Sequence, residues 1–133
     1  MKITLRTQAP ECLRYVTTGD WIFNEDGHLH VVVAEHEKND RSAFLVALHE
    51  MVEAFLCKES GIEEEAVSEF DISHPDLQEP GDHPEAPYHK QHKVALEVEK
   101  IVAEALGRDW DDHEDWVAAA GDAVEEALTK EPS

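Results

Sequence analysis

An apolar-periodic segment that also carries ionisable side chains constrains the fold of this chain more than any other feature. Its apolar stripe consists of large residues at helical spacing: Phe44, Leu48, Met51, Val52 and Phe55. The spacing predicts a helix over about residues 41–59 with this stripe directed inward. His49 and Glu53 flank the stripe, so we expect both to be partly buried. Burial is unusual for ionisable groups that lack partners.

Signals for strands precede this helix, and signals for further helices follow it. Residues 2–6 predict a short strand, and residues 20–34 predict a hairpin whose turn is Asn24-Glu25-Asp26-Gly27. Asp40 or Ser42 is suited to cap the helix at 41–59, and Ser60-Gly61 to end it.

The second half of the chain predicts a short acidic helix over 63–70, a Pro-rich loop over 71–87, and helices over about 88–106 and 111–129. The expected core positions of the last two helices are Val94, Val98, Ile101, Val102 and Ala105, then Trp116, Val117, Ala120, Val124 and Leu128.

These elements predict one α+β domain over residues 1–133. It consists of a β-rich part (1–35) with a short N-terminal antiparallel hairpin or sheet, followed by three main helices. The helix at 41–60 would carry a metal site, the loop at 71–87 would follow, and the C-terminal helices would occupy 88–130.

Composition narrows the classes of function. The 133 residues include 31 acidic and 11 basic side chains, and the formal charge is -20. Such a charge repels phosphates, so we expect no nucleic-acid partner. Two cysteines are too few for a disulfide scaffold, the N-terminus lacks the apolar core of a signal peptide, and no apolar run suits a membrane span. We therefore expect a cytoplasmic protein with reduced thiols.

The predicted helix at 41–59 carries the pattern His-Glu-x-x-Glu from His49 to Glu53. One helical turn separates these two residues, so both side chains leave the same face and can bind one divalent metal. Glu50 lies between them, at the place where a zinc hydrolase keeps its general base. The usual motif ends in His, so Glu53 stands in the place of a ligand His.

A third ligand has to come from another element. Catalytic zinc usually takes three protein ligands and a water, and two His with one Glu is a common set. His89 and His92 begin the predicted helix at 88–106 and are one turn apart. We expect His92, further inside the helix, to complete a site for Zn²⁺ or another divalent transition metal with His49 and Glu53. His89 is expected to be solvated, to support a ligand, or to bind a second metal.

The predicted strand and the following His-Glu-x-x-[His/Glu] helix resemble the minimal zincin arrangement of metallopeptidases. In the glutamate zincins the helix supplies two His ligands and a later helix supplies a Glu. The resemblance implies the same ligand set here with two places exchanged: His49 and Glu53 from the first helix, and His92 from the later one. It also implies that Glu50 takes a proton from the attacking water and returns it to the leaving group.

Most of residues 40–116 also resemble small uncharacterised phage and prophage proteins. The shared order is an H-E-x-x-E-A helix, a loop like Gly81 to Tyr88, an H-x-x-A helix and an L-G-x-D-W segment from Leu106 to Trp110. This resemblance brings no established activity. It implies the cytoplasm of a bacterial host if the protein is phage-encoded.

Three functions stay open at this point. The first is a metal-dependent hydrolase, a zincin-like peptidase acting on a peptide or small molecule, with Asp71 and Glu97 as candidates to orient a ligand His. The second is a two-metal helical site in which Glu50 and Glu53 pair with His89 and His92. The third is a non-enzymatic acidic phage accessory protein with a structural metal. None of the three needs a membrane, and the oligomeric state is open.

Overall fold

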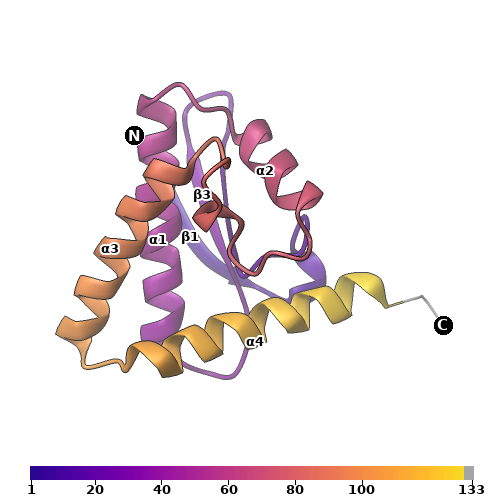
Figure 1. Cartoon of the computed structure of the whole chain (residues 1–133), viewed down its shortest axis with the longest axis vertical. Coiled ribbons are helices and arrows are strands. Elements are labelled where there is room, and N and C mark those ends of the chain that lie inside the picture. The colour runs from indigo at the N-terminus through magenta and orange to yellow at the C-terminus, as the bar shows by residue number, and fades with distance from the viewer. Residues whose placement is uncertain (131–133) are drawn as a thin grey trace.

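A three-stranded sheet precedes four α-helices in the computed structural model, which describes residues 1–130 and confirms an α+β fold (Figure 1). The strands are β1 (Ile3–Gln8), β2 (Gly19–Phe23) and β3 (Leu29–Ala34). The helices are α1 (Asp40–Glu59), α2 (Glu64–Ser73), α3 (His89–Leu106) and α4 (Trp110–Thr129), and two short 3-10 helices cover Pro10–Cys12 and Pro80–Asp82.

The sheet has the order β1-β3-β2, so β3 is its central strand. β2 and β3 form the predicted antiparallel hairpin, in which Trp21 lies opposite Val31. β1 runs parallel to β3, with Leu5 also opposite Val31. The sheet is therefore mixed, and the prediction of an antiparallel arrangement is right only for the hairpin. The reason is that β3 enters between β1 and β2, which separates the two strands that follow one another in the chain.

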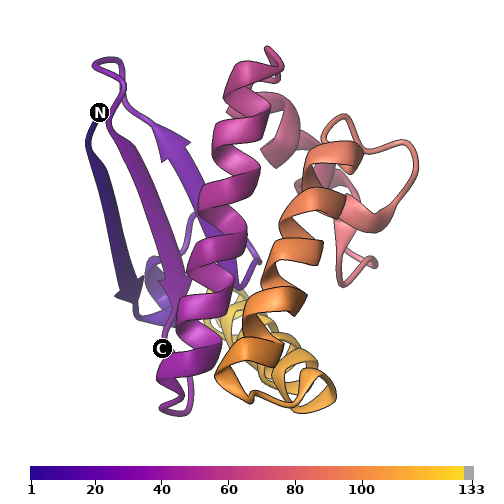
Figure 2. The same cartoon turned by 90° about the vertical axis from the view of Figure 1, so that its left-hand side faces the viewer.

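The elements form layers, with α1 between the sheet and α3 (Figure 2). α4 crosses the end of these layers and contacts α1, α3 and β3. The buried face of β3 supplies Leu29, Val31 and Val33, which are at most 2% exposed. These residues pack in one core with Val46 and Ala54 of α1.

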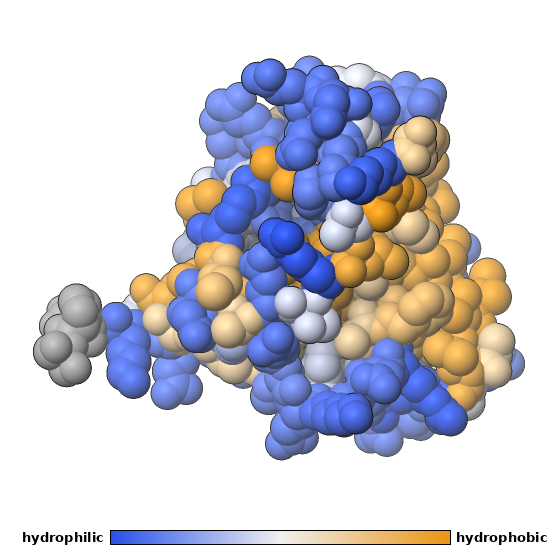
Figure 3. All heavy atoms as spheres, turned by 180° about the vertical axis from the view of Figure 1, so that it is seen from behind, coloured by the Kyte–Doolittle hydropathy of each residue, from blue (hydrophilic) through white to orange (hydrophobic). Residues whose placement is uncertain are grey.

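The central position of α1 changes which of its residues are buried. The apolar residues that it buries are Leu45, Val46, Ala47, Ala54 and Cys57. Phe44 is 51% exposed and Phe55 is 36% exposed, so the predicted inward stripe is wrong at these positions. α1 is covered on two sides, by the sheet and by α3, and the stripe lies largely outside both contacts. Figure 3 views the molecule from behind, from the side of the sheet, and shows apolar surface gathered in its right-hand half.

α3 departs from its predicted core in the same way. Val94 is 50% exposed and Ile101 is 67% exposed, and Ala105 is exposed as well. The residues that α3 buries are His92, Ala95, Glu99 and Ala103. α3 therefore meets α1 through small and ionisable side chains. In α4 the prediction is right for Trp116, Ala120 and Val124, whereas Leu128 is 37% exposed.

Asn39, and neither of the two predicted residues, caps α1. Its side-chain oxygen accepts a hydrogen bond from the backbone N–H of Ser42 at 3.0 Å. Asp40 is already the first helical residue, and Ser42 is fully buried inside the first turn. Within residues 1–130, no helix combines the length and the apolar character needed to cross a membrane.

Candidate metal centre

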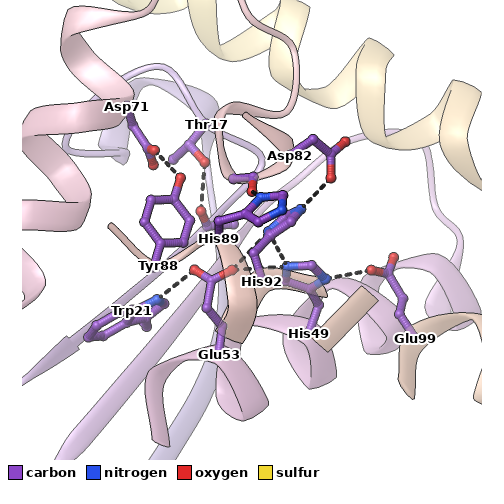
Figure 4. A network of polar contacts seen from close by, with 12 residues as sticks. Thr17, Trp21, His49, Glu53, Asp71, Asp82, Tyr88, His89, His92 and Glu99 are labelled. Atoms are coloured by element: carbon purple, nitrogen blue, oxygen red, sulfur yellow. Dashed lines mark hydrogen bonds and ion pairs between the residues drawn. The ribbon is translucent and has the colours of Figure 1, made fainter. Parts of the chain in front are cut away.

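α1 and α3 bring the three predicted metal ligands together (Figure 4). His49 Nε2 lies 3.2 Å from Glu53 Oε2 and 3.2 Å from His92 Nδ1, and the distance from His92 Nδ1 to Glu53 Oε2 is 3.0 Å. All three residues are buried, between 4% and 8% exposed. Among residues 1–130 they are the one cluster of three or more His, Cys, Asp or Glu side chains whose atoms could hold an ion.

The size of this triangle suits a small divalent ion. Zinc binds nitrogen and carboxylate oxygen at about 2.0–2.2 Å, so tetrahedral ligand atoms are about 3.3 Å apart. The observed edges of 3.0–3.2 Å would have to lengthen by only a few tenths of an ångström. Two imidazoles and a carboxylate are also ligands that zinc and its neighbours among the transition metals accept.

Hydrogen bonds on the far side of each imidazole determine which nitrogen is bare. His49 Nδ1 lies 2.7 Å from Glu99 Oε1, and His92 Nε2 lies 3.0 Å from Asp82 Oδ1. An ionised carboxylate only accepts, so each of these nitrogens carries the hydrogen and donates it. In the neutral rings, His49 Nε2 and His92 Nδ1 therefore keep lone pairs that face each other and Glu53. A carboxylate behind a ligand His is a common feature of protein zinc sites.

A buried relay continues behind His49 and fixes the direction of these bonds. Arg108 Nε can only donate, and it donates to Ser42 Oγ at 3.0 Å. The Ser42 hydroxyl can then donate to His113 Nδ1 at 2.8 Å, and His113 Nε2 donates to Glu99 Oε2 at 2.6 Å. Glu99 is left to accept from His49. Ser42 and His113 are fully buried, so water does not compete for these bonds.

The electrostatics of the cluster favour a positive charge at its centre. Burial alone would lower the pKa of His49, but hydrogen bonds with Glu53 and Glu99 outweigh it and raise that pKa well above 6.5. Burial alone would raise the pKa of Glu53, but its bonds to His49 and His92 hold that pKa below its ordinary value. Trp21 of β2 also donates to Glu53 Oε1 at 3.1 Å, which leaves Oε2 for the cluster. A proton or a metal ion can supply the missing positive charge.

Glu50, the predicted general base, lies beside the cluster without being part of it. Burial, reinforced by the charge of Glu53, raises the pKa of Glu50 well above 4.5. Within residues 1–130, no donor hydrogen-bonds to its carboxylate. β2 passes so close that a Cβ at Gly19 would lie 2.8 Å from Cγ and Oε1 of Glu50.

The three secondary candidates lie outside the cluster. His89 Nδ1 is 2.9 Å from the backbone oxygen of Gly81. This ring therefore contacts the loop and does not join Glu50, Glu53 and His92 in a two-metal site. Asp71 accepts hydrogen bonds from Tyr15 and Tyr88 and does not orient a His. Burial raises the pKa of Asp71 to about 6, although these two hydrogen bonds oppose the rise. Glu97 is exposed, and Glu99 orients His49 in its place.

Sequence reasoning missed several supporting residues, and one signal could have found Glu99. His92 and Glu99 are seven residues apart, two helical turns, and Ala95 and Ala103 lie on the same face. A face of small residues marks close contact between helices, so an acidic residue on it needs a partner. The Asp82 and Gly81 contacts come from the loop, whose path no periodicity predicts. Gly81 fits because a Cβ there would lie 2.5 Å from His92 Nδ1.

A cavity of about 710 Å³ adjoins the cluster. Its walls come from β2 and the segment before it, α1, α2, the loop that follows α2, α3 and α4. His49, Glu50, Glu53 and His92 all line it. A molecule in this cavity can therefore reach both the three ligand atoms and the carboxylate of Glu50.

Comparison of the chain with protein-family models, with curated proteins and with solved structures found no match.

Proposed function

We propose that this protein is a zinc-dependent hydrolase that cleaves peptide bonds, with His49, Glu53 and His92 as metal ligands. The observation that carries the proposal is the convergence of three acceptor atoms at 3.0–3.2 Å while the far nitrogen of each imidazole is tied to a carboxylate. Two imidazole nitrogens that face a carboxylate oxygen in a dry site need a positive charge between them, and a zinc ion supplies it while satisfying all three atoms at once.

A catalytic metal is favoured over a structural one by the number of ligands and by the cavity. Structural zinc is usually enclosed by four protein ligands, whereas catalytic zinc keeps one position open. Here three ligands adjoin a cavity whose volume lies within the usual range for small-molecule and peptide sites. Zinc in such a site polarises a substrate carbonyl and lowers the pKa of its bound water to about 7.

Glu50 would move the proton in this reaction. Its carboxylate has no hydrogen-bond donor among the described residues, lines the same cavity, and has a raised pKa. A carboxylate in that state can accept a proton from the attacking water and deliver it to the leaving nitrogen, because its affinity for protons is closer to neutral pH than usual. Glu99 and Asp82 would hold the ligand rings in place, and Trp21 would hold Glu53.

We also propose a reducing compartment such as the cytoplasm for this activity. Cys57 is fully buried and Cys12 is exposed, and neither is in a disulfide. The buried thiol of Cys57, which belongs to α1 itself, has its pKa raised to about 12 by burial, which makes it an inert packing residue.

The first experiment measures zinc per chain by native mass spectrometry on untagged protein. We expect about one zinc in the wild type and much less in His49→Ala, His92→Ala and the shape-preserving Glu53→Gln. His89→Ala is the matched control, because it removes an imidazole one turn from His92 that lies outside the cluster. Equal zinc in all variants would contradict the ligand set.

The second experiment separates binding from chemistry. Glu50→Gln should keep its zinc and lose peptide hydrolysis by a factor of about 10² to 10⁴, the usual contribution of a general base. Glu59→Gln, exposed at the end of α1, should change neither. A Glu50→Gln enzyme with wild-type turnover would show that the base has been misassigned.

A further inference from the structure

The cavity beside the candidate metal centre is lined by carboxylates. Among residues 1–130, its lining contains ten Asp and Glu residues and no Lys or Arg. An acidic lining alone does not define a binding site, because carboxylates that already have partners do not attract a substrate. The question is therefore which of these ten groups are free.

Five of the ten lining carboxylates have partners within the protein, and five have none among residues 1–130: Glu50, Asp76, Glu79, Asp122 and Glu125. Arg14 binds Asp20 through two hydrogen bonds of 2.7 and 2.8 Å, and it also binds Glu64 at 2.6 Å. Asp71 accepts from two Tyr hydroxyls. Glu53 and Glu99 belong to the ligand cluster and its relay.

Two of the free carboxylates, Asp122 and Glu125, are exposed on α4 and line the same cavity as Glu50, whereas Asp76 and Glu79 lie on the loop that follows α2. Asp122 and Glu125 are three residues apart, so they lie on one side of the helix. Neither carboxylate accepts a hydrogen bond or forms an ion pair with another group of residues 1–130. The α4 wall that leads to them is made of Val117, Ala118 and Gly121, which are small and mostly apolar.

Such a wall suits a long side chain with a positive end. Lys and Arg place an alkyl stem along apolar surface and keep the charged group at a polar rim. A stem along Val117 and Gly121 would bring that charge to Asp122 and Glu125. The rest of the ligand would then lie in the cavity that Glu50 and the ligand cluster also line. An anionic side chain in the same place would meet only carboxylates.

We propose that the cavity selects cationic peptides, and that Asp122 and Glu125 bind the Lys or Arg side chain of the substrate. This inference rests on the proposed function for the reaction itself, but its binding claim can be tested separately. In the proposed enzyme, the two carboxylates act on specificity and take no part in the chemistry.

The test uses the full-length, zinc-loaded Glu50→Gln protein and fluorescence anisotropy. Three labelled, end-blocked peptides differ only at one central residue: Lys, norleucine or Glu. We expect the Lys peptide to bind about fivefold more tightly than the norleucine peptide, as one partly exposed ion pair allows, and the Glu peptide to bind more weakly than both. E125K should abolish or reverse this order.

E126K is the matched control. Glu126 is the next residue of the same helix, is exposed, does not line the cavity, and gives the same change in net charge. It should leave the preference for Lys unchanged. Equal binding of the three peptides, no binding of any of them, or equal loss of preference in E125K and E126K would overturn the inference.

Hydrolysis of the same peptides by the wild type separates this inference from the proposed function. Cleavage of all three with equal kcat/KM would overturn the cationic preference and leave the hydrolase. Charge-selective binding that depends on Glu125, without cleavage of any peptide, would retain the cationic site and contradict the hydrolase.

Discussion

At the scale of single residues, the candidate centre depends on hydrogen-bond direction as much as on its three ligands. His49 can offer a bare Nε2 only while its Nδ1 hydrogen is donated to Glu99. Glu99 accepts it as an ionised carboxylate, because hydrogen bonds with His113 and His49 outweigh burial and hold the pKa of Glu99 below its ordinary value. The relay therefore selects the imidazole tautomer that a metal requires.

Replacing Glu99 by Gln should weaken zinc binding by about 10- to 100-fold, the usual effect of losing a group behind a ligand His. The amide keeps the shape of the side chain but removes the charge that holds the His49 hydrogen. A competition titration against a chromogenic chelator measures the change. Glu97→Gln, two residues away and exposed, is the control and should bind zinc like the wild type. Equal affinities for the two variants would remove Glu99 from the site.

Two glycines allow metal binding and turnover to be impaired separately. A Cβ at Gly81 would lie 2.5 Å from His92 Nδ1, and a Cβ at Gly19 would lie 2.8 Å from Glu50 Oε1 and from Val46 Cγ1. Gly81→Ala should displace the His92 ring and lower the zinc content. Gly19→Ala should keep the zinc and lower kcat/KM, because it displaces Glu50. Each should cost about 1–3 kcal/mol of stability through overpacking. The same zinc loss in both variants would contradict this division.

At the scale of elements, α1 contacts the sheet on one side, α3 on another, and solvent on the rest of its surface. One side packs apolar residues on β3, and another presents His49 and Glu53 to α3. The apolar stripe that is clearest in the sequence lies largely outside both contacts, with Phe44 half exposed. A buried polar side and an exposed apolar side together obscure the amphipathic pattern on which sequence reasoning relies.

The cap of α1 gives a stability prediction that does not involve the metal. Asn39→Ala removes the hydrogen bond to the Ser42 N–H and should lower the free energy of unfolding by about 1 kcal/mol. Asn39→Asp keeps an acceptor and should retain most of that stability. Urea titration in excess chelator measures both variants. A loss equal for Ala and Asp would show that the side chain does not act as a cap.

The order of the elements and the placing of His49 and Glu53 on one helix face could be predicted from the sequence because both are local patterns. Hairpin turn, helix ends and the one-turn spacing of His49 and Glu53 involve neighbours along the chain. What could not be predicted depends on how elements pack: the parallel pairing of β1, the buried side of α3, and the contact of Asp82 with His92. Glu97 and Glu99 differ in the side of α3 that they occupy. Glu99 is on the side that packs against α1 and contacts His49, whereas Glu97 faces solvent.

At the scale of the whole molecule, protons and the proposed zinc ion would compete for the same two imidazoles. Burial opposes the charged form of both His49 and His92, but hydrogen bonds to Glu53 raise the pKa of each above 6.5. In the metal-free protein, a raised His pKa stabilises the fold fully below the unfolded value of about 6.5. That contribution is lost as the pH rises through the folded pKa values. Zinc needs the bare nitrogens, so its binding strengthens over the same range.

The stability that zinc adds should therefore grow as the pH rises from 6.5. We expect the difference in unfolding free energy between zinc-loaded and chelator-treated protein to increase by about 2.7 kcal/mol per pH unit for two protons displaced from His49 and His92, and more steeply where Glu50 and Glu79, whose pKa values burial raises, also lose protons to zinc. Urea titrations between pH 6.5 and 8 measure it. Groups distant from the centre cancel in the difference, because they titrate alike with and without zinc. Glu53 also cancels, since its pKa lies below 4.5 and it stays ionised throughout this range.

In His49→Ala the difference should be small at every pH. A difference that stays constant or shrinks as the pH rises would show that zinc does not displace protons from His49 and His92.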